Sequence, residues 1–324
     1  MTSCTAVFRG ISILLAGVLM SACQPGPDEA APRAAKLTNQ APAAAQPAPT
    51  LQELTNAMYQ GVEEAGAPFA LANGRWEGKP YEPGGASAPS VTFVRDFRLT
   101  GDLDGDGAEE AVVLLAAGTG GTGEMSYVAV VGRPGGSVVN VATAPIGDRV
   151  QVRHARIAEG RIVFDLVQAG EGDAACCPGD LVTRTWALSG AVLKEAAPVK
   201  TGRLSLDTLA GTEWVLKSWA WDEPGPAAPE VTLKLDGTRF VGSAGCNNYF
   251  APVEAGDSPG GIKVGPAGST RKMCPDPAMS AETRFLQQLN GVAQLRFVGG
   301  RLALPYTKPD QTFGVMLFER RTAQ

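Results

Sequence analysis

The chain has 324 residues, of which 44% are hydrophobic and 19% are charged, and its formal net charge is −5. This length favours two domains over one. The 40 glycines and 24 prolines favour turn-rich β structure with a linker over a helical bundle. The mild negative charge and the lack of a Lys/Arg cluster exclude nucleic-acid binding. A single histidine, His154, argues against a His-based metal site or catalytic triad.

The N-terminus has the pattern of a secretory signal peptide. Arg9 precedes an apolar run over residues 11–20 that is too short to span a bilayer as a stable helix. The run ends in Leu-Met-Ser-Ala before Cys23, which resembles the lipobox of bacterial lipoproteins. The resemblance implies cleavage before Cys23 and acylation of this cysteine, with about 0.8 kcal/mol of anchoring energy per buried methylene. The alternative is an ordinary signal peptide with a fortuitous cysteine.

The next residues predict where the protein resides and how it is divided. Gln24, rather than Asp, follows the cysteine, and the lipoprotein resemblance then implies the outer membrane of a two-membrane cell, facing the periplasm. The Ala/Pro-rich stretch that follows cannot bury enough apolar surface to order itself, so we expect a disordered tether. The predicted segments are a signal peptide at 1–22, the tether at 23–50, a β-rich N-terminal domain at 51–200 and a second domain at 206–324.

The N-terminal domain is predicted to be mostly strands. A short helix is expected over 51–58. After it, runs of β-branched and aromatic residues bounded by Gly, Pro or Asp predict strands at 91–94, 111–115, 127–131, 161–167 and 183–188. We therefore expect the α+β class, predominantly β, with two compact β-rich domains.

An acidic stretch lies between two of these predicted strands and reads Asp-Leu-Asp-Gly-Asp-Gly-Ala-Glu-Glu over 102–110. Alternating carboxylates offer several oxygens to a hard cation, and Gly107 permits the turn that aims them inward. The stretch lacks flanking helices, so it is not an EF-hand, but it resembles the calcium loop of FG-GAP-type β repeats. On that resemblance the ligands of a structural Ca²⁺ would be the side chains of Asp102, Asp104, Asp106 and Glu110 and the carbonyl of Ala108. The alternative is a solvated acidic turn.

Six cysteines have different expected fates. Cys4 would leave with the signal peptide and Cys23 is the lipid site, so four remain, and an even number in an oxidising envelope suggests disulfides. The pairing that keeps each bridge within its own domain joins Cys246 to Cys274 and Cys176 to Cys177. The first bridge would close a loop of about 28 residues and stabilise the fold by roughly 3–4 kcal/mol. The alternative for the second pair is free thiols.

The second domain is predicted from strands at 211–216, 231–235, 239–241, 301–304 and 314–318. An Asp-Gly pair at 236–237 predicts a two-residue hairpin turn. A helix is expected over 281–290, with Ser280 as its N-cap and a buried stripe of Phe285, Leu286 and Leu289.

From about residue 206 to 321 the chain resembles a META domain, the family that includes the HslJ heat-shock protein. The segments that carry the resemblance are Leu209–Trp214, Gly245–Tyr249, Thr270–Cys274, Glu282 with Phe285-Leu286, and Leu302–Leu304. The resemblance implies a META-type sheet with one packed helix, a disulfide between Cys246 and Cys274, and a link to envelope stress and drug tolerance. It implies no catalytic residues. The preceding domain resembles an uncharacterised region found with META domains in some envelope lipoproteins.

The sequence therefore predicts a lipid-anchored envelope protein that is not an enzyme and acts as a binding or structural module. Its expected partners are the membrane, through the anchor, and an envelope protein, and we expect a monomer with no cofactor other than Ca²⁺. One rival hypothesis is a thiol-dependent enzyme or redox protein that uses Cys176 and Cys177. Another is an inhibitor or partner-capturing lipoprotein.

Overall fold

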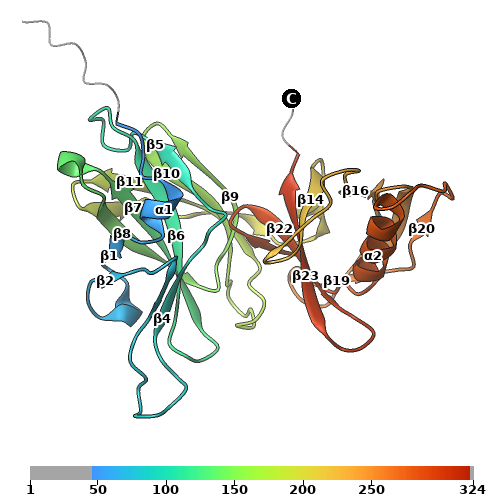
Figure 1. Cartoon of the computed structure of the whole chain (residues 1–324), viewed down its shortest axis with the longest axis horizontal. Helices are drawn as coiled ribbons and strands as arrows, with labels where there is room; N and C mark the ends of the chain where they lie inside the picture. The colour runs from blue at the N-terminus through green and yellow to red at the C-terminus, as the bar shows by residue number, and fades with distance from the viewer. Residues whose placement is uncertain (1–45, 322–324) are drawn as a thin grey trace, which may run out of the picture. The chain divides into compact units, whose positions relative to one another are not determined.

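The computed structural model describes residues 46–321, so the predicted signal peptide, Cys23 and most of the tether lie outside the described residues. The described residues belong to one compact unit. Strands dominate this unit (Figure 1), so the predicted class, predominantly β, is confirmed. In the described part of the chain, no helix combines the length and the apolar character that crossing a membrane requires.

The first region opens with a single helical turn, α1 (Leu51–Leu54), closed by a capping box. Thr50 donates its N–H to Glu53 Oε2 at 2.8 Å, and Glu53 donates its N–H to Thr50 Oγ1 at 3.3 Å. The helix ends earlier than the predicted residue 58 because Met58 already pairs with another strand. This small hairpin consists of β1 (Met58–Tyr59) and β2 (Phe69–Ala70), with the 3₁₀ turn η1 (Glu63–Ala65) between them.

Six antiparallel strands form the first large sheet in the order β3-β4-β6-β7-β8, and β5 pairs with β6 beyond the end of β4. Their bounds are β3 Arg75–Glu77, β4 Ser90–Phe93, β5 Leu99–Gly101, β6 Glu110–Gly118, β7 Glu124–Gly132 and β8 Val139–Asp148. A 3₁₀ turn, η2 (Pro134–Gly136), precedes β8. The strand β8 was not predicted, because it contains Pro145 and its pairing with β7 is interrupted by register shifts.

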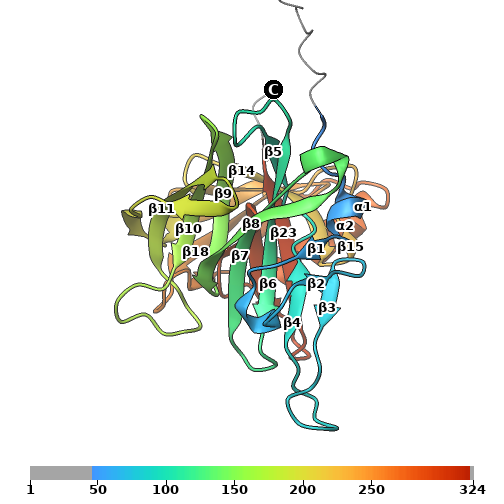
Figure 2. The ribbon, with the colours of Figure 1, turned by 90° about the vertical axis from the view of Figure 1, so that its left-hand side faces the viewer.

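The strands β6 and β7 are buried on both faces, which explains their continuous apolar runs. Figure 2 shows them side by side. Because side chains alternate between faces, Val113 and Leu115 pack under α1 and the β1–β2 hairpin, whereas Val112 and Leu114 face a second sheet. The six-stranded sheet is thus the middle layer of the N-terminal region.

Five strands form this second sheet in the order β12-β11-β10-β9, with β13 also paired to β11. Their bounds are β9 Gln151–Ala158, β10 Arg161–Gln168, β11 Asp180–Ser189, β12 Val192–Glu195 and β13 Val199–Arg203. Phe164 and Trp186 are fully buried between the two sheets and meet edge to face, with ring centroids 5.3 Å apart. The aromatic pair contributes to the packing between the two sheets.

The C-terminal region follows the 3₁₀ turn η3 (Leu206–Leu209) and is built on a ten-stranded sheet in the order β19-β18-β17-β16-β14-β23-β22-β21. Two short strands extend it, β15 along β14 and β20 along β18. The bounds are β14 Glu213–Ala220, β15 Glu223–Pro224, β16 Thr232–Asp236, β17 Arg239–Ser243, β18 Asn248–Ala255, β19 Ile262–Val264, β20 Gly268–Ser269, β21 Arg296–Val298, β22 Arg301–Thr307 and β23 Phe313–Arg320.

Helix α2 (Ala278–Asn290) packs on this sheet and begins three residues earlier than predicted. The predicted cap, Ser280, lies inside the first turn. Asp276 Oδ1 accepts hydrogen bonds from the N–H of Ser280, at 3.2 Å, and from its hydroxyl, at 2.7 Å. A side chain four residues before Ser280 therefore accepts a backbone N–H of the first helical turn. Phe285 and Leu289 are fully buried in the core of the C-terminal region.

Candidate functional site

The acidic loop, residues 102–109, connects β5 to β6 and brings three carboxylates together. Oxygens of Asp102, Asp104 and Asp106 all lie within 4.8 Å of one another, and the three residues are exposed. Asp102 Oδ2 accepts the N–H of Gly107 at 3.1 Å, which draws the loop around its own first carboxylate. Gly107 has a φ of 87°, a left-handed conformation that glycine adopts without steric cost.

The two other predicted ligands are placed differently. Glu110 begins β6, is only 5% exposed, and accepts the N–H of Leu103 at 2.9 Å. Burial raises the pKa of Glu110; the N–H of Leu103 opposes this shift, and the charges of the three aspartates add to it. Ala108 donates its N–H to Asp106 Oδ1 at 2.7 Å. The structure therefore brings three predicted ligands to one point, while Glu110 lines the same cavity of about 300 Å³ as Asp104 and Asp106.

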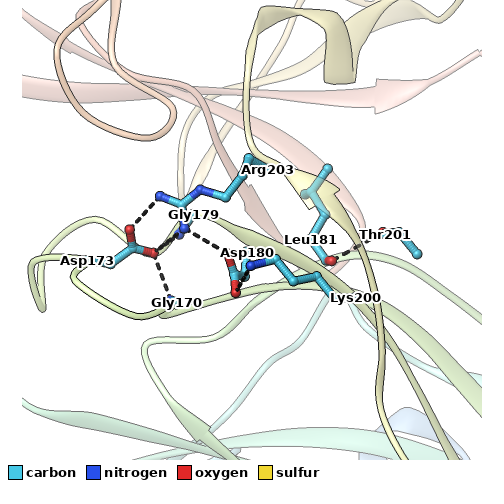
Figure 3. Close-up of polar contacts among 8 residues, drawn as sticks. All are labelled: Gly170, Asp173, Gly179, Asp180, Leu181, Lys200, Thr201 and Arg203. Atoms are coloured by element: carbon cyan, nitrogen blue, oxygen red, sulfur yellow. Dashed lines mark hydrogen bonds and ion pairs between the residues drawn. The ribbon is translucent and has the colours of Figure 1, made fainter.

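A second candidate site is the cysteine loop, residues 170–179, which precedes β11 and carries the Cys176–Cys177 disulfide. Cys176 is exposed and Cys177 is half-buried. Asp173 closes the base of the loop, because its Oδ2 accepts the N–H groups of Gly170 and Gly179, each at 2.8 Å (Figure 3). The two ends of the loop are thus joined through one carboxylate.

An ionic clamp, formed by Asp173, Asp180, Lys200 and Arg203, holds this base in place (Figure 3). Arg203 contacts Asp173 at 2.5 Å and Asp180 at 2.7 Å, and Lys200 contacts Asp180 at 2.8 Å. The bonds from Arg203 and from the N–H of Gly170 lower the pKa of Asp173 to about 2.

Sequence reasoning missed the ionic clamp. Asp173 and Arg203 are 30 residues apart and no motif joins them. They meet because β11 pairs with β13, which sets Asp180 opposite Arg203. The sequence signals for this clamp are weak. They are a Gly-Asp pair before a strand and an arginine at the end of a later strand, and neither is specific for an ion pair.

The signature of the C-terminal region is tied to α2 through Asn247, which is only 2% exposed. Asn247 donates its backbone N–H to Glu282 Oε2 at 2.9 Å and its side-chain amide to both carboxylate oxygens, at 3.0 and 3.2 Å. Its Oδ1 accepts the hydroxyl of Thr270 at 2.7 Å. Beside this network the structure joins Cys246 to Cys274. Five of the residues that carry the resemblance to META domains therefore bond among themselves: Cys246, Asn247, Thr270, Cys274 and Glu282.

The single histidine, His154, belongs to an ion-pair cluster on β9 and β10. Its Nδ1 lies 3.6 Å from Asp165 Oδ2, and Arg156 contacts the same oxygen at 3.3 Å. Burial lowers the pKa of His154 and the charge of Arg320 lowers it further, while Asp165 opposes this shift. Among the described residues, no hydrogen bond or ion pair joins His154 to Cys176.

A family model matches the C-terminal region of this chain, and a solved structure is similar to part of the chain. An NMR structure of a protein from Burkholderia xenovorans is 22% identical, with 36% of this chain and 86% of that chain covered and a TM-score of 0.29. None of the curated proteins matches the chain. A family model described as the META domain matches residues 207–317, from η3 to β23. The C-terminal region of this chain therefore carries a META domain.

Proposed function

We propose that this chain is a lipid-anchored protein of the cell envelope, facing the periplasm from the outer membrane, whose folded part is a binding or structural module and not an enzyme. The observation that carries the proposal is how the META signature is used. Asn247 and Glu282 are buried and bond to each other, and Cys246 bonds to Cys274. Side chains engaged in this way stabilise a fold rather than act on a substrate. The lipobox-like sequence ending at Cys23 supports the anchor.

Replacing the acylated cysteine tests the anchor. Wild-type protein should sediment with membranes and be released by detergent, because two or more acyl chains give stable anchoring. Cys23→Ala should lose this membrane association. Cys4→Ala is the matched control, since this cysteine would be removed with the signal peptide, and it should behave as wild type.

A second measurement makes the test independent of the variant. The N-terminal peptide of the mature wild-type protein should begin at Cys23 and carry the mass of its acyl chains. An unmodified N-terminus, or Cys23→Ala protein that still requires detergent for release after its signal peptide has been cleaved, would contradict the anchor.

We also propose that the acidic loop binds a structural divalent cation such as Ca²⁺. The convergence of the Asp102, Asp104 and Asp106 oxygens within 4.8 Å favours this second function, because Ca²⁺ takes its ligands from carboxylate oxygens. The buried Glu110 on the same cavity wall adds a further carboxylate nearby. The cation would neutralise charges that otherwise repel each other at the start of β6.

Thermal unfolding with and without Ca²⁺ tests this site. At a concentration about 100-fold above Kd, binding stabilises the native state by about 2.7 kcal/mol, which should raise Tm by roughly 5 °C or more. Asp104→Ala should abolish the shift. Asp257→Ala, which removes an exposed loop carboxylate elsewhere, should preserve it. An equal Tm with Ca²⁺ and with chelator in wild type would leave a solvated acidic turn.

A further inference from the structure

The Cys176–Cys177 disulfide sits on a loop whose base is fixed independently of the bond. Asp173 joins the two loop ends, and Arg203 secures Asp173. Gly179 also lies tightly against the C-terminal region, since a side chain there would come within 2.7 Å of Pro259. The sulfur–sulfur bond is not one of the contacts that hold the base, so it can open without releasing the base of the loop.

The two sulfurs have different surroundings. Cys176 is exposed, and its carbonyl accepts a hydrogen bond from Nη2 of Arg296 at 2.7 Å. Cys177 is half-buried, and its Sγ lies 4.0 Å from the side-chain amide nitrogen of Gln294, which donates toward it. Cys176 is thus the more exposed of the two residues, and the sulfur of Cys177 faces an N–H donor.

The backbone that carries the donor beside Cys177 is held in position by contacts within the C-terminal region. Leu295, the neighbour of Gln294, is fully buried and donates its N–H to the carbonyl of Gly260 at 2.8 Å. Gln294 itself forms an antiparallel bridge with Gly261. An N–H donor stabilises negative charge that develops on a nearby atom, here a sulfur that leaves as thiolate.

We infer that Cys176–Cys177 is a thiol–disulfide exchange site that accepts electrons from a dithiol reductant, with Cys176 as the attacked sulfur and Cys177 as the leaving thiolate. A thiolate of the reductant bonds to Cys176 Sγ, the Cys176–Cys177 bond breaks, and Cys177 leaves with the electron pair and takes up a proton. The second thiol of the reductant then attacks the mixed disulfide and releases Cys176. The protein gains two electrons and two protons, and the reductant becomes a disulfide. In this inference the protein is the substrate of the exchange rather than its catalyst.

The cysteine pair of the META domain provides the internal reference. Cys246 and Cys274 are both half-buried, so neither offers the exposure of Cys176. Exchange requires access of the attacking thiolate to a sulfur. The Cys176–Cys177 bond should therefore open at a lower reductant concentration than the Cys246–Cys274 bond.

The test uses the full chain purified without reductant. It is treated briefly with 2-mercaptoethanol, then quenched with excess N-ethylmaleimide at mildly acidic pH, and its peptides are weighed by mass spectrometry. The expected product carries 2-mercaptoethanol on Cys176 and the alkyl group on Cys177. With graded dithiothreitol, Cys176 and Cys177 should become alkylated before Cys246 and Cys274. An adduct on Cys177, simultaneous opening of both bonds, or free Cys176 and Cys177 thiols in the isolated protein would overturn the inference.

A variant pair tests the leaving-group donor. Gln294→Ala should slow the opening about tenfold, the size of one hydrogen bond to a charged group. Gln287→Ala, an exposed glutamine on α2, is the control and should open at the wild-type rate. Intact Cys246–Cys274 and an unchanged melting temperature would show that Gln294→Ala is folded. An unchanged opening rate in the folded variant would remove the role assigned to Gln294.

Discussion

The Cys246–Cys274 bond joins the segment before β18 to the segment before α2, and its two cysteines are 28 residues apart in the sequence. The Cys176–Cys177 bond joins two neighbouring residues. In the chain-entropy description, a disulfide stabilises by restricting the unfolded chain, so a bond between neighbours contributes little. The cysteine loop is closed instead by the carboxylate of Asp173. The first segment is therefore held by a covalent bond, whereas the cysteine loop is closed by a carboxylate whose charge depends on pH.

Loss of the Cys246–Cys274 disulfide should destabilise the protein most. Cys246→Ser combined with Cys274→Ser should lower the free energy of unfolding by about 3–4 kcal/mol, the chain-entropy value for a loop of this length. Denaturant unfolding followed by the fluorescence of the buried Trp214 measures it. A loss below about 1 kcal/mol would show that the Asn247–Glu282 network alone holds the signature.

The next largest effect should come from the base of the cysteine loop. Asp173→Asn removes the charge that Arg203 contacts, and the side chain of Asp173 is only 5% exposed. We expect a loss of about 2 kcal/mol in the free energy of unfolding, typical of a hydrogen-bonded charge in a protected site. Asp222→Asn, at an exposed position, is the control and should change little. Equal stabilities of the two variants would contradict the role of the ionic clamp.

Acid should weaken the same loop. The pKa of Asp173 is lowered from 3.8 to about 2, first by Arg203 and then by the N–H of Gly170. Because the folded-state pKa lies below the unfolded one, the stabilisation is present above about pH 4 and is lost as the pH falls toward 2. The pKa of Asp180 is also lowered, first by Lys200 and then by Arg203.

Thermal unfolding of wild type and Asp173→Asn between pH 6 and pH 2 isolates this contribution. The difference in Tm between the two proteins should shrink toward acid, because protonation abolishes the charge that the variant lacks. The Cys246→Ser/Cys274→Ser variant should keep a constant difference from wild type over the same range. A difference for Asp173→Asn that stays constant with pH would contradict the assigned pKa.

Much of the fold follows from local sequence patterns. The apolar runs of β6 and β7 predicted strands, and burial on both faces explains why these runs do not alternate with polar residues. The acidic stretch predicted a turn with converging carboxylates, and Asp102, Asp104 and Asp106 do converge. In each case the residues that decide the structure are close together in the sequence.

The features that escaped prediction depend on residues that meet only in the folded chain. Arg203 reaches Asp173 through the pairing of β11 with β13, and Gln294 reaches Cys177 from a distance of 117 residues. The predicted start of α2 was too late. Ser280 has the chemistry of an N-cap, but it lies inside the helix and donates its N–H and its hydroxyl to Asp276 Oδ1. Composition and spacing carry no information about such long-range partners.

Loss of the Cys176–Cys177 bond should change stability least. Cys176→Ser combined with Cys177→Ser should change the free energy of unfolding by less than about 0.5 kcal/mol, because the bond restricts little of the unfolded chain and neither cysteine is fully buried. Combining it with Asp173→Asn in a double-mutant cycle tests independence. Additive losses mean that the ionic clamp holds the loop without help from the disulfide. A loss of more than about 1 kcal/mol from the serine pair alone would mean that the bond carries structure, and a bond that carries structure is poorly suited to open in exchange with a dithiol.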